Sequence, residues 1–159
     1  MRELQLIRSV DDKRRLDLHG IGSVRFENMW GTKLCLSAPG HVDWHVARRG
    51  RRGGTTAIDA TGAAVATLDG RRVEHGHRAV DVTTPHQGIL DRRPPFVLVE
   101  GDRELAKVAP HVWSEKPVDV TITDEDFAAE EPHLLLFALW AANRIAASRQ
   151  AGAAAGGVT

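Results

Sequence analysis

The segment spanning residues 132–147, PHLLLFALWAANRIAA, constrains the fold more than any other, because its helical pattern is apolar on every side. A helix without a polar face cannot lie on a protein surface, so other structure or lipid must surround it. Its unbroken apolar run, residues 134–142, would rise only about 14 Å, well short of the roughly 30 Å hydrocarbon core of a bilayer. We therefore predict a helix in the protein core rather than a membrane span.

Most of the chain before this helix consists of short strand candidates separated by turn residues, a spacing typical of an all-β sandwich or barrel. The segment VDVTI alternates cleanly between apolar and polar residues, so one of its faces is expected to be buried and the other solvated. The candidates together predict a β-shell around the C-terminal helix. They span residues 4–9, 23–27, 33–37, 42–47, 63–68, 71–75, 79–83, 96–100, 103–109 and 118–122.

Two hairpins are predicted from pairs of turn residues between neighbouring strand candidates. Asp69-Gly70 is typical of a type I′ turn, and Gly101-Asp102 places glycine first, as in a type II′ turn. The segment 47–55, ARRGRRGGT, carries too much charge and glycine for a buried element and is predicted to be a loop.

The ends of the predicted helix carry suitable residues. Pro132 fits the first helical position, where a missing N–H has no cost. Glu130 and Glu131 complement the positive end of the helix dipole, and Arg144 and Arg149 complement the negative end.

Length and composition limit the domain organisation and the class of protein. The 159 residues suffice for one core, so we predict a single domain over residues 1–149 and a disordered tail over 150–159. Cys35 is the only cysteine, which excludes a disulfide within the chain and a cysteine-built zinc site. With 21 basic and 21 acidic residues, the chain lacks the positive field of a general nucleic-acid binder. The N-terminus shows no signal peptide, so we expect a cytoplasmic protein without a transmembrane segment.

The order and pattern of these segments resemble the tubby C-terminal-like superfamily, which includes the LURP-one-related proteins and the phospholipid scramblases. The resemblance covers roughly residues 55–147. It is carried by the hairpin ATGAAVATLDGRRV (60–73), by the run FVLVEGDRELAKVAPHVWSEKPVDVTITDEDF (96–127), and by the helix HLLLFALWAANRIA (133–146). It implies a mainly β fold, namely a closed antiparallel barrel of about twelve strands around a buried hydrophobic C-terminal helix.

The resemblance also implies a non-enzymatic binding or regulatory role. Family members tether membranes through phosphoinositides or move lipids in response to calcium. This chain shows no basic strand pattern that aligns with the tubby phosphoinositide site, and no hydrophobic tail of the scramblase kind.

The basic segment Arg48, Arg49, Arg51 and Arg52 is the candidate binding site. Guanidinium groups pair bidentately with anionic oxygens, and the glycines around them let the backbone approach a ligand. The segment therefore predicts contact with an anionic membrane surface or a phosphorylated ligand. A solvated loop without a ligand is the alternative interpretation.

A metal site is a competing hypothesis. His41, Asp43 and His45 alternate on the strand candidate 42–47, and two histidines with a carboxylate suit zinc or iron(II). Because alternation spaces neighbouring side chains about 7 Å apart, a polar outer face opposite Val42, Trp44 and Val46 is the favoured interpretation. The spacing of His75 and His77 is the same and has the same alternative.

No catalytic motif is evident in the chain. The turn Thr84-Pro85-His86 offers a histidine as a general base, but nothing identifies a nucleophile beside it. GxSxG, Walker-type, GxGxxG and HExxH patterns are absent, so no catalytic residue and no cofactor is predicted. The tryptophans at 30, 44, 113 and 140 are expected to pack in the core.

Three functions follow from these observations. The preferred one is a non-enzymatic binding or regulatory protein, and the second is a metal-dependent enzyme using His41, Asp43 and His45. The third, a β-barrel carrier for a small apolar ligand, is disfavoured because the helix would occupy the volume that such a ligand needs.

Overall fold

A computed structural model of the chain describes residues 1–28, 32–48, 54–84, 95–109 and 117–156. The twelve strands are β1 Arg2–Arg8, β2 Arg15–Leu18, β3 Gly22–Phe26, β4 Lys33–Ser37, β5 Trp44–Arg48, β6 Thr55–Ile58, β7 Ala64–Asp69, β8 Arg72–His75, β9 Arg78–Thr83, β10 Phe96–Glu100, β11 Arg103–Ala109 and β12 Val118–Ile122. The two helices are α1 Glu125–Glu130 and α2 Pro132–Gly156.

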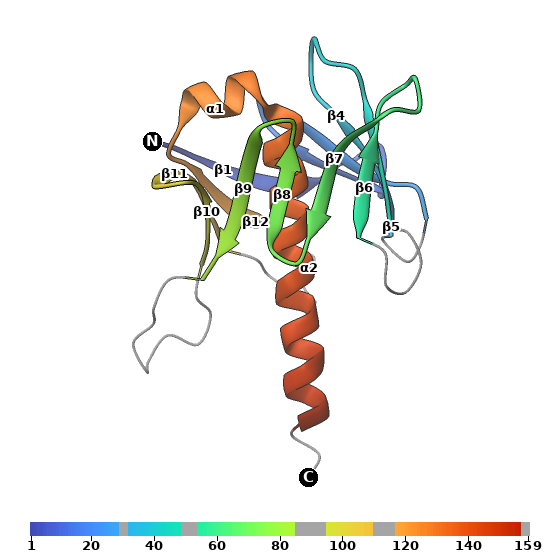
Figure 1. Cartoon of the computed structure of the whole chain (residues 1–159). Helices are drawn as coiled ribbons and strands as arrows, with labels where there is room; N and C mark the ends of the chain where they lie inside the picture. The colour runs from blue at the N-terminus through green and yellow to red at the C-terminus, as the bar shows by residue number, and fades with distance from the viewer. Residues whose placement is uncertain (29–31, 49–53, 85–94, 110–116, 157–159) are drawn as a thin grey trace.

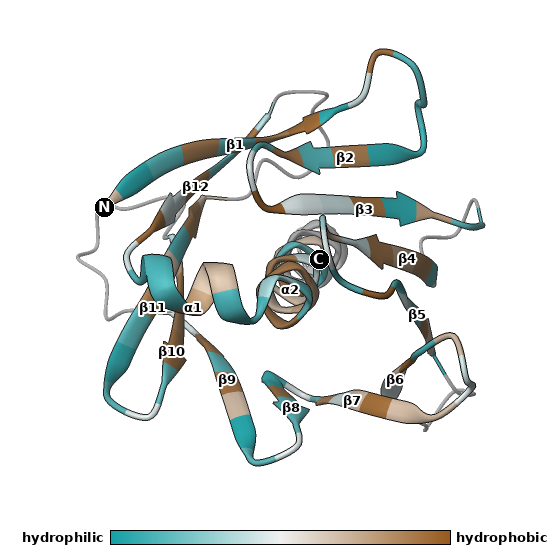
Figure 2. Cartoon of the chain, turned by 90° about the horizontal axis from the view of Figure 1, so that it is seen from above, coloured by the Kyte–Doolittle hydropathy of each residue, from teal (hydrophilic) through white to brown (hydrophobic). Residues whose placement is uncertain are grey.

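The strands form a closed antiparallel barrel in which each strand pairs with its neighbours in the sequence. The barrel closes where β1 pairs with β12, with Arg2 opposite Ile122 and Leu6 opposite Val118. Figure 2 shows the strands as a ring with α2 at its centre. The expected mainly β barrel of about twelve strands around a C-terminal helix is therefore confirmed.

The first half of α2 fills the barrel. Every side chain from residue 134 to residue 142 is buried, including Leu135, Leu136, Leu139 and Trp140. The strands contribute the other side of this core through their inward-facing positions, such as Leu34 and Leu36 on β4. A helix apolar on all sides is stable here because strands surround it on all sides.

The second half of α2 leaves the barrel at the end opposite α1, as the red helix of Figure 1 shows. The helix continues past the expected end at residue 147 to Gly156. Residues 150–156, expected to belong to a disordered tail, are therefore helical. Alanine has the highest helix propensity, and its abundance here explains the extension.

The beginning of α2 matches the prediction, since Pro132 is its first residue. Just before it, α1 is capped by Asp124, whose side chain accepts a hydrogen bond from the Phe127 N–H. Glu131 separates the two helices, and its carbonyl accepts the first α2 hydrogen bond, from Leu135.

Several predicted boundaries need correction. β2 and β6 are absent from the predicted strands, and β5 begins at Trp44 rather than at 42. The turn between β7 and β8 is Gly70-Arg71 rather than Asp69-Gly70, because Asp69 pairs with Arg72. Glycine then occupies the first turn position, at a φ of 61° that suits glycine better than aspartate. The predicted turn at Gly101-Asp102 lies where expected.

Candidate functional site

An arginine pocket lies where α2 leaves the barrel, between the lower ends of β5 to β8 in Figure 1. Its volume is about 520 Å³. Its walls come from the end of β5, the start of β6, the β7–β8 hairpin and one face of α2. The lining residues are Arg48, Gly54, Thr55, Leu68, Gly70, Arg71, Ala141, Arg144, Ile145 and Ser148.

The charge of this pocket is positive. Arg48 comes from the end of β5, Arg71 from the β7–β8 turn and Arg144 from α2. None of the described lining residues carries a carboxylate. Because guanidinium groups present several N–H donors in a fixed plane, three of them around one hollow form a site for an anion with several oxygens.

Arg144 is held in place by its surroundings. Its guanidinium lies 5.3 Å from the centre of the Trp140 ring, within the range of a cation–π contact. Burial, and then the positive charge of Arg48, lowers the pKa of this guanidinium. Two like charges therefore approach each other at the pocket, an arrangement that a bound anion would stabilise.

Arg71 is more exposed and lies at the rim. Its Nη1 donates a hydrogen bond of 3.1 Å to Thr84 Oγ1 at the end of β9. This bond holds the side chain across the barrel end while leaving other N–H groups of the fork available.

The predicted basic segment is described only in part. Arg48 lines the pocket, whereas Arg49, Arg51 and Arg52 lie outside the described residues. Arg71 and Arg144, for which no binding role is predicted from sequence, complete the arginine pocket. These arginines lie far apart in the sequence, so sequence spacing does not predict the cluster. The closed barrel and the passage of α2 through it bring them together.

A histidine pocket of about 500 Å³ lies at the opposite end of the barrel, around the first turn of α2. Trp44 packs between two of its histidines, with ring centres 4.9 Å from His75 and 5.1 Å from His133. His41 lies 5.7 Å from His133 by the same measure. These rings are tilted by about 60° to one another, so the pocket is lined by a cluster of aromatic rings in edge contact.

His133 is the buried member of this group, at 3% exposure. Its Nε2 lies 2.6 Å from the carbonyl oxygen of Val42, so Nε2 carries the proton and donates it. The buried Nδ1 has no hydrogen-bond partner. Burial lowers the pKa of His133 and keeps the ring neutral.

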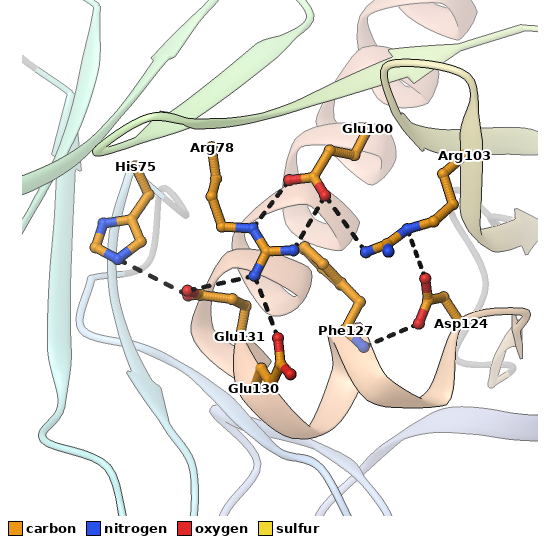
Figure 3. A network of polar contacts seen from close by, with 8 residues as sticks. All are labelled: His75, Arg78, Glu100, Arg103, Asp124, Phe127, Glu130 and Glu131. Atoms are coloured by element: carbon orange, nitrogen blue, oxygen red, sulfur yellow. Dashed lines mark hydrogen bonds and ion pairs between the residues drawn. The ribbon is translucent and has the colours of Figure 1, made fainter.

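A network of ion pairs joins this end of the barrel to the helices (Figure 3). Arg78 on β9 contacts Glu100 at 3.0 Å, and its Nη1 reaches Glu130 at 3.5 Å and Glu131 at 3.8 Å. Its guanidinium also lies over the Phe127 ring, 4.9 Å from the centre. This network fixes the position of α1 and of the start of α2 against the barrel.

The residues of the competing metal hypothesis, His41, Asp43 and His45, do not alternate along a single strand. His41, Val42 and Asp43 precede β5, so the alternation on one strand fails before Trp44. Val42, predicted to point inward, is 63% exposed, because its carbonyl and not its side chain contacts the helix. Only His45 of the three lies in a group of potential metal ligands within the described part of the chain, together with Glu27 and Cys35.

The structure also places the other histidines and the tryptophans that the sequence analysis names. The Nδ1 of His75 contacts the Val65 carbonyl at 2.6 Å, while His77 lies in the β8–β9 turn. Trp44 and Trp140 are buried as expected. Other sequence predictions, at Trp30, Pro85, His86 and Trp113, lie outside the described residues.

Comparison of the chain with protein-family models, with curated proteins and with solved structures finds no match. The resemblance to tubby-like proteins therefore stays a prediction. No helix in the described part of the chain is both long and apolar enough to cross a membrane.

Proposed function

We propose that this chain is a non-enzymatic binding or regulatory protein that holds a phosphorylated ligand in its arginine pocket. The observation that carries the proposal is the approach of Arg48, Arg71 and Arg144 to one hollow whose described lining has no carboxylate. A phosphate group offers several charged oxygens to such an arrangement, and each charge-assisted hydrogen bond contributes about 1.5 to 3 kcal/mol.

The chemistry of the lining favours binding over turnover. Apart from the arginines, its polar side chains are the hydroxyls of Thr55 and Ser148. Histidine, cysteine and carboxylate side chains, which serve as general bases or activate nucleophiles, are missing from the lining that the structure describes. An arginine, with its high pKa, orients and neutralises a ligand without exchanging protons with it.

The phosphate can belong to an acidic lipid headgroup or to a soluble molecule, and two measurements separate these sources. Calorimetry with inositol hexakisphosphate tests a soluble ligand. Co-sedimentation with vesicles containing phosphatidylserine or a phosphoinositide, against vesicles of neutral lipid, tests a membrane surface. In either case binding should weaken as salt is raised, because screening acts over a Debye length of about 8 Å at physiological ionic strength.

The variants Arg71→Gln and Arg144→Gln should each weaken binding by roughly tenfold or more, which corresponds to about 1.4 kcal/mol. Arg14→Gln changes the net charge equally but lies on the β1–β2 connection, outside the pocket lining, and should bind like the unchanged protein. Thermal unfolding of each variant verifies that it is folded. Equal affinity in all four proteins, or binding of neither probe, would contradict the proposal.

We also propose that the protein acts in the cytoplasm and is related to the tubby-like proteins. The barrel with a helix through its centre supports this relationship at the level of fold. The carrier alternative has little support, because α2 fills the barrel interior where an apolar ligand would bind.

A further inference from the structure

Three side chains that are distant in the sequence meet on the outer face of the barrel, at β3 to β5. Cys35 on β4 pairs directly with His45 on β5, and both lie on the face opposite the buried Leu34 and Leu36. Glu27 follows β3, and its N–H donates to the Lys33 carbonyl at 2.8 Å, which places it beside β4. Adjacent strands of a closed barrel therefore set the backbone positions of all three residues.

The potential ligand atoms of this group lie close together. His45 Nδ1 is 2.8 Å from Glu27 Oε1, and one ligand atom from each of Glu27, Cys35 and His45 lies within 4.8 Å of the others. Bonds from zinc to sulfur, nitrogen and oxygen are about 2.0 to 2.3 Å long, so small rotations about the side-chain torsions bring all three atoms to one ion. We propose that Glu27, Cys35 and His45 form a binding site for a divalent transition metal of the zinc type.

The charges around the group favour a cation. Arg25, the cross-strand neighbour of Cys35 on β3, is held at 2.8 Å by Asp12. Glu27 supplies the negative charge of the group, and the neighbouring Arg25 is already engaged by another carboxylate, Asp12.

The ligand set selects the class of metal. A thiolate and an imidazole prefer zinc and its neighbours among the transition metals over the hard cations calcium and magnesium. Binding replaces the S–H bond of Cys35 with a bond from sulfur to the metal, and the proton passes to solvent. His45 binds as the neutral imidazole and Glu27 as the carboxylate, so no oxidant or reductant takes part.

Cobalt(II) provides a direct test, because a thiolate ligand gives this ion a charge-transfer band in the near ultraviolet. We expect the reduced full chain to develop this band at one equivalent of cobalt, and zinc to abolish it by displacement. In weakly buffered solution near neutral pH, about one proton should be released for each ion bound. Absence of the thiolate band under these conditions would overturn the proposal.

Variants separate this site from the one predicted from sequence, at His41, Asp43 and His45. Cys35→Ser should remove the band, and His45→Gln should weaken cobalt binding by at least about tenfold. His41→Gln is the matched control and should bind cobalt unchanged, since His41 faces the histidine pocket. Equal weakening in His41→Gln and His45→Gln would contradict the Glu27, Cys35 and His45 assignment. The three ligand residues lie outside the barrel core, and circular dichroism verifies that each variant is folded.

Discussion

The Nε2 atom of His133 lies 2.6 Å from the carbonyl oxygen of Val42, which ties the first turn of α2 to the connection between β4 and β5. The imidazole is buried, and its Nδ1 has no partner. Protonation of Nδ1 would place an unpaired charge at the end of the core, and this is why burial lowers the pKa of His133.

This contact predicts a dependence of stability on acid. The unfolded chain binds a proton at His133 with a pKa near 6.5, whereas the folded chain binds it only at lower pH. Between these two values the unfolded state holds more protons, so the free energy of unfolding should fall as the pH decreases below about 6.5. One proton can contribute at most about 1.4 kcal/mol per pH unit to this slope.

Denaturant unfolding at a series of pH values checks this expectation. His133→Gln removes the titrating group and should flatten the slope below about pH 6.5. His19→Gln, at an exposed histidine in the β2–β3 connection, should keep the slope of the unchanged protein. An unaltered slope in His133→Gln would refute the assignment.

A second prediction concerns Arg78 and Glu100. The hydrogen bond from Arg78 lowers the pKa of Glu100, and both side chains are largely buried, at 20% and 24% exposure. Arg78→Met should reduce the free energy of unfolding by about 1 to 3 kcal/mol, because Glu100 and Glu131 then lack this partner. The exposed pair of Arg72 and Glu74 provides the control, and Arg72→Met should cost less than about 1 kcal/mol.

The pair of Arg78 and Glu100 also predicts that the fold loses stability in acid, here through a carboxylate and not through His133. Since the folded-state pKa of Glu100 is lowered, its stabilising contribution is present above about pH 4.3 and is lost as the pH falls through the folded value. Glu100→Gln should lose this part of the acid dependence. A double-mutant cycle with Arg78→Met measures the coupling, and simple additivity of the two variants would show that the contact does not stabilise the fold.

The third prediction tests the central helix. Leu136 has no exposed surface, and Leu136→Asp places a charge among apolar side chains at a cost of several kcal/mol, against a typical total stability of about 5 to 15. We expect this variant not to fold. Val42→Asp, at an exposed position, should fold normally. Cooperative thermal unfolding of purified Leu136→Asp would refute the central position of α2.

The fourth prediction concerns Gly22, where β3 passes close to other backbone. A Cβ atom at this position would lie 2.2 Å from the Ser37 carbonyl oxygen and 3.0 Å from Leu136 Cδ1. Gly22→Ala should therefore destabilise the fold by about 1 to 3 kcal/mol through overpacking. Ser23→Ala, at the next position, tests whether any change to this strand has the same effect. Denaturant midpoints that coincide for the two variants would contradict the steric explanation.

Much of the fold is predictable because local patterns determine it. The all-round apolar segment over residues 132–147 requires surrounding structure, and alternation identifies strands such as β12 directly. β6 escapes prediction because its buried positions carry small or polar residues, Ala57 and Thr55, which give little hydrophobic signal. The extension of α2 to Gly156 escapes because residues 150–156 have weak apolar character, which predicts disorder, although their alanines favour a helix.

The candidate sites are less predictable, because strand register brings their residues together. Sequence spacing groups His45 with His41 and Asp43, yet Cys35 lies directly opposite His45 on the neighbouring strand. Arg144 meets Arg48 and Arg71 only because α2 passes through the barrel and leaves it at the end where these two arginines lie. Neither relationship has a periodic signal in the sequence.

The pairing of β1 with β12 has a consequence for the order of folding. During synthesis, β1 emerges from the ribosome long before its partner β12. The inward-facing side chains of the strands stay exposed until α2, which follows all the strands in the chain, covers them. Such a non-local arrangement slows folding and leaves apolar surface accessible meanwhile. The nascent chain should therefore depend on chaperones until its last helix has emerged.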